Sequence, residues 1–354
     1  MMKASGRIGA KSETGAKSAK TAVIIFAAAA ASLAAIILGV AAGSVFVSPG
    51  QILRIFGKRL FGTSLGDVPA SYESIIMEIR FPRVVLGFLT GAALSVCGAT
   101  VQSVLRNPLA SPFTLGVSSG ASLGAGLVIA LELHFLGRFT LPAAGLIFGV
   151  AAMFLMVAFA SKIDRTLQGS TIILTGMVLS LFVNGIVTLM ANAKSDKYQQ
   201  IMKWQTGTFS GRKWDYAAML AVVFLLCFGF MLAKSREMDL LTFGDEQAGS
   251  VGLDTRFTKT SLMIAVAVLS GTAVSFAGVI GFVDLISPHI ARKLFGAKHR
   301  LLLPMAAVIG GIFMVLCDLA ARTVISPNEL PVGVVTSLLG APFFAWVFFS
   351  KRKR

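Results

Sequence analysis

The sequence predicts an all-α membrane protein, a polytopic bundle of about ten transmembrane helices. Of its 354 residues, 55% are hydrophobic and only 14% are charged, too few charges for the surface of a soluble domain of this length. The apolar residues gather into long runs, and a helix needs about 20 such residues to cross a bilayer. Small residues at helical spacing, such as Gly116, Gly120 and Gly124, favour close contact between such helices.

Nine runs without Asp, Glu, Lys or Arg are candidate spans. They cover residues 21–47, 84–105, 113–131, 139–160, 171–193, 216–233, 260–283, 301–317 and 330–349. The first run is too long for the hydrophobic region of a signal peptide, so we interpret it as a retained helix. The seventh continues to residue 291 with only Asp284 and Pro288 as interruptions, which is long for one crossing and short for two.

Basic residues at both ends of the chain decide the number of crossings. Residues 1–20 read as a basic cytoplasmic tail, residues 21–350 as the membrane domain, and Lys351 to Arg354 as a basic cytoplasmic end, because basic residues beside helix ends favour the cytoplasm. Two cytoplasmic ends require an even number of crossings.

The seventh run should therefore hold two tightly connected passes. We expect them at residues 260–276 and 279–295, with Gly271 and Gly278 easing the turn.

Composition argues against several other classes. The net charge of +16 would suggest a nucleic-acid partner in a soluble protein, but here the basic residues lie at the termini and between apolar runs. The three cysteines and three histidines have no metal-ligand or disulfide spacing, and we expect no metal and no cofactor. An intramembrane enzyme would need a nucleophile with a base or a metal set, which these residues do not supply.

Two blocks of ordered motifs carry a family resemblance. The first block comprises Ile79-Arg80-Phe81-Pro82-Arg83, the segment Arg106 to Pro112, and Leu115-Gly116-Val117-Ser118-Ser119-Gly120-Ala121. The second comprises Pro288-His289-Ile290-Ala291-Arg292, Glu329-Leu330-Pro331-Val332-Gly333 and Gly340-Ala341-Pro342-Phe343-Phe344. From about residue 20 to the end, the chain closely resembles the FecCD-type permeases of iron-siderophore, haem and cobalamin ABC importers.

The resemblance implies a type II ABC importer permease with several partners. Two such subunits, identical or paralogous, would flank one path through the cytoplasmic membrane. Separate cytoplasmic ATPases would drive transport, and an extracytoplasmic binding protein would deliver the cargo. The chain itself contains no Gly-x-x-x-x-Gly-Lys-Ser/Thr phosphate loop, so we expect no ATP hydrolysis by it.

The motifs say little about the cargo. Ferric-siderophore complexes are the commonest use of the family and are our expectation, with haem and cobalamin as alternatives. An ion-coupled secondary transporter is a different class, and it would show charged or broken midplane helices in paired halves. Only Asp284 and Asp318 are candidates for such charges, and they do not repeat.

Arg80, Arg83 and Arg322 fall at the outer ends of predicted helices. The family resemblance implies that these arginines are docking points for acidic residues of the binding protein. A guanidinium pairs well with a carboxylate. The alternative is that these side chains only reach for the membrane interface. Asp318 could pair with Arg322, four residues further along a helix.

Residues 234–259 form a long connection between the sixth and seventh spans. The segment mixes apolar and acidic residues, as expected of an element that lies in a groove of a partner. By resemblance it couples the permease to the ATPase, and the alternative is a solvated loop. The expected coupling residues are Phe243, Gly244, Asp245, Glu246, Ala248, Val251 and Gly252.

Gly169, Ser170 and Thr171 begin the fifth span after the loop 161–171. By resemblance they form the cytoplasmic gate of the path. The alternative is a helix start capped by Ser170 or Thr171. Gln102 and Asn184 could line the path or bond between helices.

Overall fold

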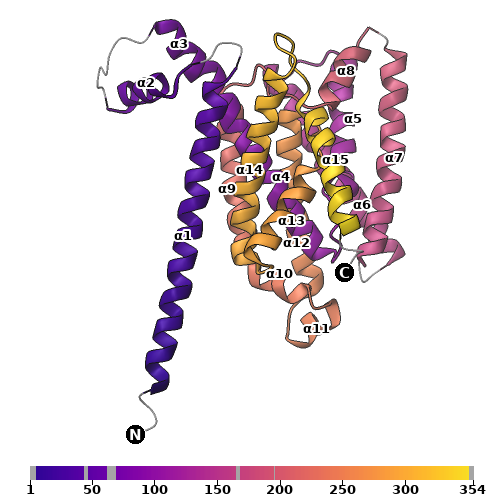
Figure 1. The fold of residues 1–354 in the computed structure, drawn as a ribbon. Helices are drawn as coiled ribbons and strands as arrows, with labels where there is room; N and C mark the ends of the chain where they lie inside the picture. Colours follow the sequence, from indigo (N-terminus) through magenta and orange to yellow (C-terminus); the bar gives the residue numbers. More distant parts are fainter. Residues whose placement is uncertain (1–4, 44–46, 62–68, 165–167, 195, 351–354) are drawn as a thin grey trace.

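The computed structural model describes residues 5–43, 47–61, 69–164, 168–194 and 196–350. They form an all-helical bundle, which confirms the predicted fold class (Figure 1). Within these residues, seven helices are long and apolar enough to cross a membrane. The basic end at 351–354 lies outside the described residues.

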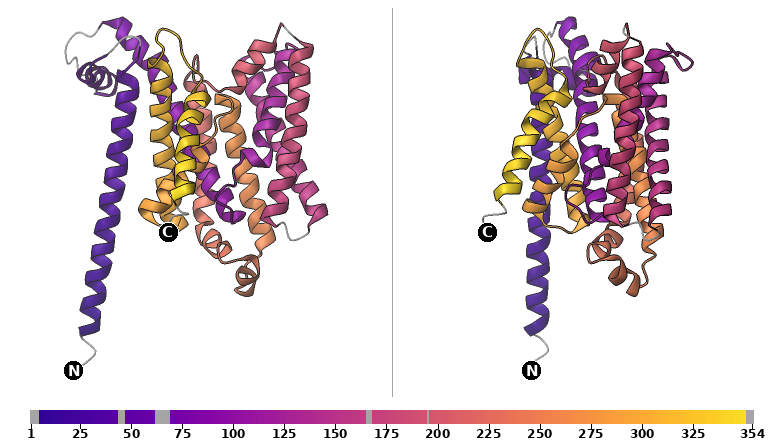
Figure 2. Two further views of the ribbon diagram at one scale, coloured as in Figure 1. Left: turned by 45° about the vertical axis from the view of Figure 1, so that its right-hand side comes forward. Right: turned by 90° about the vertical axis from the view of Figure 1, so that its right-hand side faces the viewer.

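Ten helices lie where the ten crossings were expected, although only seven of them, over the residues that the structure describes, meet the length and hydropathy of a membrane span. Figure 2 shows them standing side by side from two further directions. Their bounds are α1 Ser5–Ala41, α4 Phe81–Val104, α5 Val117–Ala130, α6 Thr140–Ile163, α7 Gly169–Ala193, α9 Trp214–Ala233, α12 Thr255–Ala277, α13 Val283–Phe295, α14 His299–Thr323 and α15 Val332–Ser350.

Short helices cover the two ends of the bundle. At one end lie α2 Pro49–Phe61, α3 Ala70–Ser74 with the π-helix Ile75–Arg80, and α8 Tyr198–Gln205. At the other end lie α10 Ser235–Leu241 and α11 Asp245–Ser250 (Figure 1). The first turn of α1 and the last turn of α15 lie on the same side as α10 and α11.

The helix α1 differs from the rest in its surroundings. It begins at Ser5, so the helix runs through most of the segment expected to be a tail. In the most apolar 18-residue stretch of α1 only 17% is buried, whereas 83% is buried in the corresponding stretch of Ser71–Val104, which includes α4. Figure 1 shows α1 standing apart from the bundle towards its first turn, with α4 among the other helices.

The two passes predicted for the seventh run exist, but the second is shorter than expected. The helix α12 ends at Ala277, and residues 278–282 are not helical before α13 begins at Val283. Gly278 and Phe282 have φ angles of 81° and 70°, a left-handed backbone that stops helix propagation. The prediction of a turn at Gly278 is correct, whereas Gly271 lies inside α12 and residues 279–282 were wrongly predicted as helix.

Glycines set the closest helix contacts. A Cβ on Gly91 of α4 would lie 2.1 Å from the carbonyl oxygen of Gly310 in α14. A Cβ on Gly120 or Gly124 of α5 would similarly meet carbonyl oxygens of α6 at 2.4 or 2.5 Å. The packing interpretation of these small residues is thus correct, because only a missing side chain lets the backbones come this close.

Candidate functional site

The end of the bundle that carries α2, α3 and α8, which we predict to be the outer end, holds a buried cluster of opposite charges. Arg83 donates to Asp318 with an Nη2–Oδ1 distance of 2.9 Å and to Glu329 with an Nη1–Oε1 distance of 2.8 Å. Arg322 also reaches Asp318, with an Nε–Oδ2 distance of 3.1 Å, as the four-residue spacing predicted. One buried aspartate therefore joins two arginines, from α4 and α14, and the charges are satisfied within the subunit.

Arg80 and Arg322 donate hydrogen bonds to the last carbonyls of α1. Arg80 Nη1 lies 3.1 Å from the carbonyl oxygens of both Val40 and Ala41, and Arg322 Nη2 lies 2.8 Å from that of Gly39. The last carbonyls of a helix have no partner within it, and they carry the negative end of its dipole. Cationic donors here fasten α1 to the bundle at its outer end.

Arg80, Arg83 and Arg322 are only 6%, 6% and 8% exposed, so their guanidinium groups are engaged within the subunit. The spacing of Asp318 and Arg322 indicated one of these contacts. No local pattern indicated the pairing of Arg83 with Asp318, because the two lie 235 positions apart in the chain. A docking role for the three arginines stays a prediction.

The predicted coupling segment forms two short helices, α10 at the lower ends of the neighbouring helices and α11 below them (Figure 1). Phe243 and Val251 are 73% and 66% exposed, although both are apolar. Ala248 is buried and holds α11 against the bundle. Gly244 and Gly252, with φ angles of 119° and 88°, supply backbone conformations that other residues rarely adopt. The segment thus presents two large apolar side chains on a fixed scaffold.

A cleft of about 640 Å³ joins this segment to the predicted gate. Three parts of the chain line it, namely the end of α4, the start of α7 and the start of α11. The lining residues are Leu105, Arg106, Gln168, Gly169, Ser170, Gly244, Asp245, Glu246 and Gln247. Two sites that sequence analysis treated separately therefore share one hollow.

The start of α7 rests on the end of α4. A Cβ on Gly169 would lie 2.4 Å from the carbonyl oxygen of Leu105, so only glycine fits there without displacement. The residue before the helix is Gln168, and no side chain caps the helix, so the alternative of a Ser170 or Thr171 cap is wrong. The gate assignment stays a prediction.

Hydrogen bonds and an ion pair connect the short helices α10 and α11 to the membrane helices, and the sequence analysis did not predict them. Asp239 of α10 accepts hydrogen bonds from the ring Nδ1 and the backbone N of His299, at 2.5 and 3.0 Å. The other ring nitrogen of His299 lies 2.5 Å from Ser103 Oγ of α4. Lys259 of α12 pairs with Asp245 at 2.6 Å. A buried lysine in an otherwise apolar helix was the available signal, because such a charge needs a partner.

Asp284 occupies the start of α13, packed against α4. A Cβ on Gly98 of α4 would lie 1.9 Å from the backbone oxygen of Asp284. The hydroxyl of Ser111 bonds to the Asp284 side chain, and Gln102 Nε2 donates to its backbone oxygen at 3.2 Å. Arg292 of α13 in turn donates to Gln102 Oε1 at 2.6 Å. Gln102 thus forms hydrogen bonds between α4 and α13, which is one of the two roles predicted for it.

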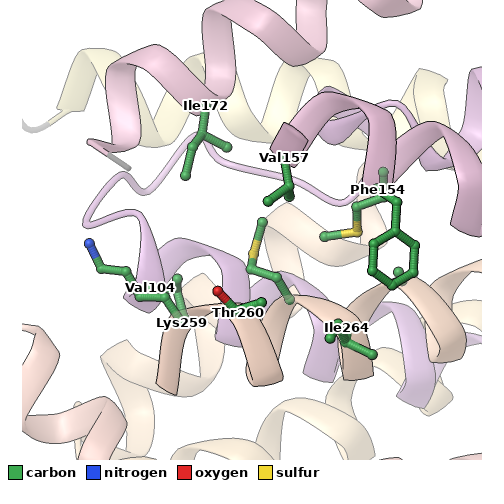
Figure 3. Close-up of a pocket in the computed structure, with 10 residues that line it drawn as sticks. Val104, Phe154, Val157, Ile172, Lys259, Thr260 and Ile264 are labelled. Atoms are coloured by element: carbon green, nitrogen blue, oxygen red, sulfur yellow. The ribbon is translucent and has the colours of Figure 1, made fainter. Parts of the chain in front are cut away.

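An apolar cavity lies between α6, α7 and α12 (Figure 3). Val104, Val157, Ile172 and Ile264 line it, and the amine of Lys259 points away from Phe154 and Ile264. Its volume is about 50 Å³, far below the several hundred Å³ typical of a small-molecule site. This cavity cannot hold a metal chelate.

The helix α7 carries a polar stripe that turns from α5 towards the outside of the bundle. Ser180, Asn184, Thr188 and Asn192 recur every fourth residue. Ser180 lies against Ser119 of α5, with an Oγ–Oγ distance of 3.4 Å, and the last three residues of the stripe are exposed. Thr188 and Asn192 bond back to carbonyls of their own helix, at 2.9 and 2.8 Å. Amide side chains are costly in hydrocarbon, so such a stripe normally faces protein or water rather than lipid.

A family model for the FecCD transport family matches residues 30–350, nearly the whole chain. The chain belongs to the FecCD transport family. It is 41% identical over 320 residues to the ABC transporter permease YvrB of Bacillus subtilis, covering 90% of this chain and 91% of that protein. It is 38% identical over 288 residues to the cobalamin import permease BtuC of Halobacterium salinarum, covering 81% and 76%.

The fold agrees with a solved member of this class. The FecCD permease described here superposes with a TM-score of 0.81 on an ABC transporter chain assigned to the metal-chelate type, in an inward-facing conformation. The two are 27% identical, and the match covers 92% of this chain and 99% of the other. The chain is therefore a multi-pass permease subunit of an ABC transporter, and the predicted family is confirmed.

Proposed function

We propose that this permease moves ferric-siderophore complexes across the cytoplasmic membrane, along a path that two permease subunits form together. The polar stripe of α7 carries this proposal, because a face with exposed Asn184, Thr188 and Asn192 is suited to a water-filled path and not to lipid. The cavity of about 50 Å³ within the subunit is too small for a chelate, which also favours a path between subunits. The second subunit is an identical copy or a paralogue.

The two ends of the bundle suggest which partner binds where. Separate ATPases would bind at α10 and α11, where Phe243 and Val251 are exposed together with Glu246. The first turn of α1 and the last turn of α15 share this side, which agrees with two cytoplasmic termini (Figure 1). The cleft lined by Gly169 and Ser170 opens on this side as well. These two residues and Thr171, the next in the chain, would form the cytoplasmic gate.

A substrate-binding protein would dock at the opposite end. The three arginines are engaged internally, so docking through them requires an exchange of acceptors. Glu329, whose side chain is 38% exposed, is the carboxylate on Arg83 that an acidic side chain of the binding protein would displace. Asp318 would stay in place and keep α4 and α14 together.

The choice of cargo rests on similarity. Relatives in the family include an iron(3+)-hydroxamate permease and a hemin permease, 35% and 34% identical to this chain. The metal-chelate transporter of similar fold supports a ferric chelate. Haem and cobalamin are the alternatives, the second because of the cobalamin permease at 38% identity.

Uptake measurements test both the cargo and the path. Cells with and without the gene would be given labelled ferric hydroxamate, ferric citrate, haemin and cobalamin. We expect loss of ferric hydroxamate uptake on deletion, and at least a fivefold lower rate for Asn184→Leu at a wild-type amount of protein in the membrane. Phe182→Ala is the matched control, because Phe182 is 67% exposed on the same helix and lies about 160° around the axis from Asn184.

Uptake of haemin or cobalamin alone would replace the cargo assignment. A wild-type rate for Asn184→Leu would remove α7 from the path.

A further inference from the structure

The short helix α10 packs on the membrane helices with the buried side chains of Met238 and Leu241, and one carboxylate adds a directional polar link. Asp239 Oδ1 accepts from both the ring and the backbone of His299, at 2.5 and 3.0 Å. His299 is the first residue of α14 and is 1% exposed. Its other ring nitrogen lies 2.5 Å from Ser103 Oγ, near the end of α4. Three elements that are distant in the sequence therefore meet at one imidazole.

This contact restrains position more than an ordinary surface ion pair does. Two donors of one residue, held by one carboxylate, fix both distance and direction, and the ring is held from its far side as well. The Asp239 carboxylate also lies at the positive end of the α14 dipole, which favours its charge there. Long side chains in exposed ion pairs lack this restraint and contribute little.

The helices α4 and α14 are joined along their whole length. At the outer end Arg83 pairs with Asp318 at 2.9 Å. In the middle the backbones of Gly91 and Gly310 touch, and a short way further Ser95 Oγ donates to the Ala306 oxygen at 2.7 Å. Such contacts leave little room for sliding, because any shift would break a buried hydrogen bond or bring backbone atoms into collision.

The other short helix, α11, is bound to a different membrane helix, α12. Asp245, the first residue of α11, pairs at 2.6 Å with Lys259 of α12, whose side chain is 6% exposed. A change of the angle between α10 and α11 would thus become a movement of the α4–α14 pair relative to α12.

We propose that Asp239 and His299 are positioning residues that make α10 move as one body with the α4–α14 pair, and so carry movements of the ATPase to the outer end of the permease. The proposal rests on the proposed role of residues 234–259 as the ATPase contact. It adds the residues through which that contact acts on the membrane helices. Asp239 and His299 need not touch the ATPase or the cargo.

The test uses the complete complex in lipid nanodiscs and measures how far the binding protein increases the ATPase rate. We expect Asp239→Ala and His299→Ala each to reduce that increase at least fivefold. The double variant should be no worse than either single one, because one contact is lost in all three. Asp239→Asn should retain part of the increase, since its amide oxygen can still accept from His299.

Glu237→Ala is the matched control. Glu237 lies on the same helix but pairs with Lys234, inside the same segment, at 3.0 Å. This substitution removes a carboxylate from α10 and leaves its link to α14 intact. We expect it to keep the wild-type response.

Hydrogen exchange on the purified permease separates this inference from the proposed function, because it needs no partner. Amides of α10 and of the first turn of α14 should exchange faster in Asp239→Ala than in Glu237→Ala. Unchanged exchange, a wild-type ATPase response of Asp239→Ala, or additive effects in the double variant would overturn the inference. Failure of the wild-type permease to bind any ATPase would instead overturn the proposed function.

Discussion

The two ends of this permease differ in what they leave exposed. At the outer end, Arg83, Asp318 and Arg322 are buried and bonded to one another and to the carbonyls of α1. At the other end, Phe243 and Val251, on either side of α11, are exposed to solvent beside a cleft of about 640 Å³. The first arrangement is complete within one chain, whereas the second leaves apolar groups uncovered, as expected of the proposed contact with a partner. The same bundle thus has one end built for stability and one built for contact.

The largest effect is expected at the outer end. Asp318→Ala would leave two buried guanidinium groups without their shared carboxylate, and breaking a buried pair in this way costs about 3–5 kcal/mol. Thermal unfolding in detergent, followed by circular dichroism, measures the loss. Glu73→Gln is the control, because its partners Lys58 and Arg59 are 58% and 66% exposed, and it should cost at most about 1 kcal/mol. Equal losses in both variants would mean that the outer cluster contributes no more than a surface pair.

A smaller effect, on binding alone, is expected at the cytoplasmic end. Phe243→Ala should weaken ATPase binding about tenfold, because a large apolar side chain at an interface is a typical anchor. The unfolding temperature should stay unchanged, since the side chain is 73% exposed. Co-purification with the ATPase gives the first quantity. Leu294→Ala on α13 is the matched control at 65% exposure, and a similar loss there would show that the contact is not confined to the coupling segment.

The smallest effect concerns Glu329, at the border between buried and exposed charge. Glu329→Gln removes a carboxylate that competes for Arg83 while Asp318 remains, so we expect the binding protein to bind severalfold more tightly. Surface plasmon resonance on nanodiscs measures the affinity. Unchanged or weaker binding would separate docking from the arginine cluster and leave that cluster with a structural role only.

Local patterns in the sequence predicted most of the helices. The apolar runs, the break at Gly278 and the long connection at residues 234–259 all follow from neighbouring residues, and all are present. The contacts of Arg83 and Arg80 were not predicted for the opposite reason. Arg83 bonds to carboxylates more than 200 positions away and Arg80 to the backbone of α1, which no local pattern shows. The contact of Arg322 with Asp318, by contrast, follows from their four-residue spacing.

The short α13 and the links of Asp239 and Lys259 show the same limit. A run of apolar residues indicates burial but not where a backbone turns left-handed, as at Phe282. His299 was seen only as a scattered histidine, because its partners Asp239 and Ser103 come from two other helices. Family motifs indicated the region of the coupling segment and the gate but not the cleft that unites them.

The four-residue spacing of the stripe on α7 has a geometric consequence. Successive residues of an α-helix are rotated by about 100°, so every fourth residue advances the stripe by about 40° around the axis. From Ser180 to Asn192 the polar line turns by about 120° while it rises about 18 Å. If two such helices face each other across the proposed path, its polar lining is helical and not straight, so the polar groups that a cargo meets change direction as it advances.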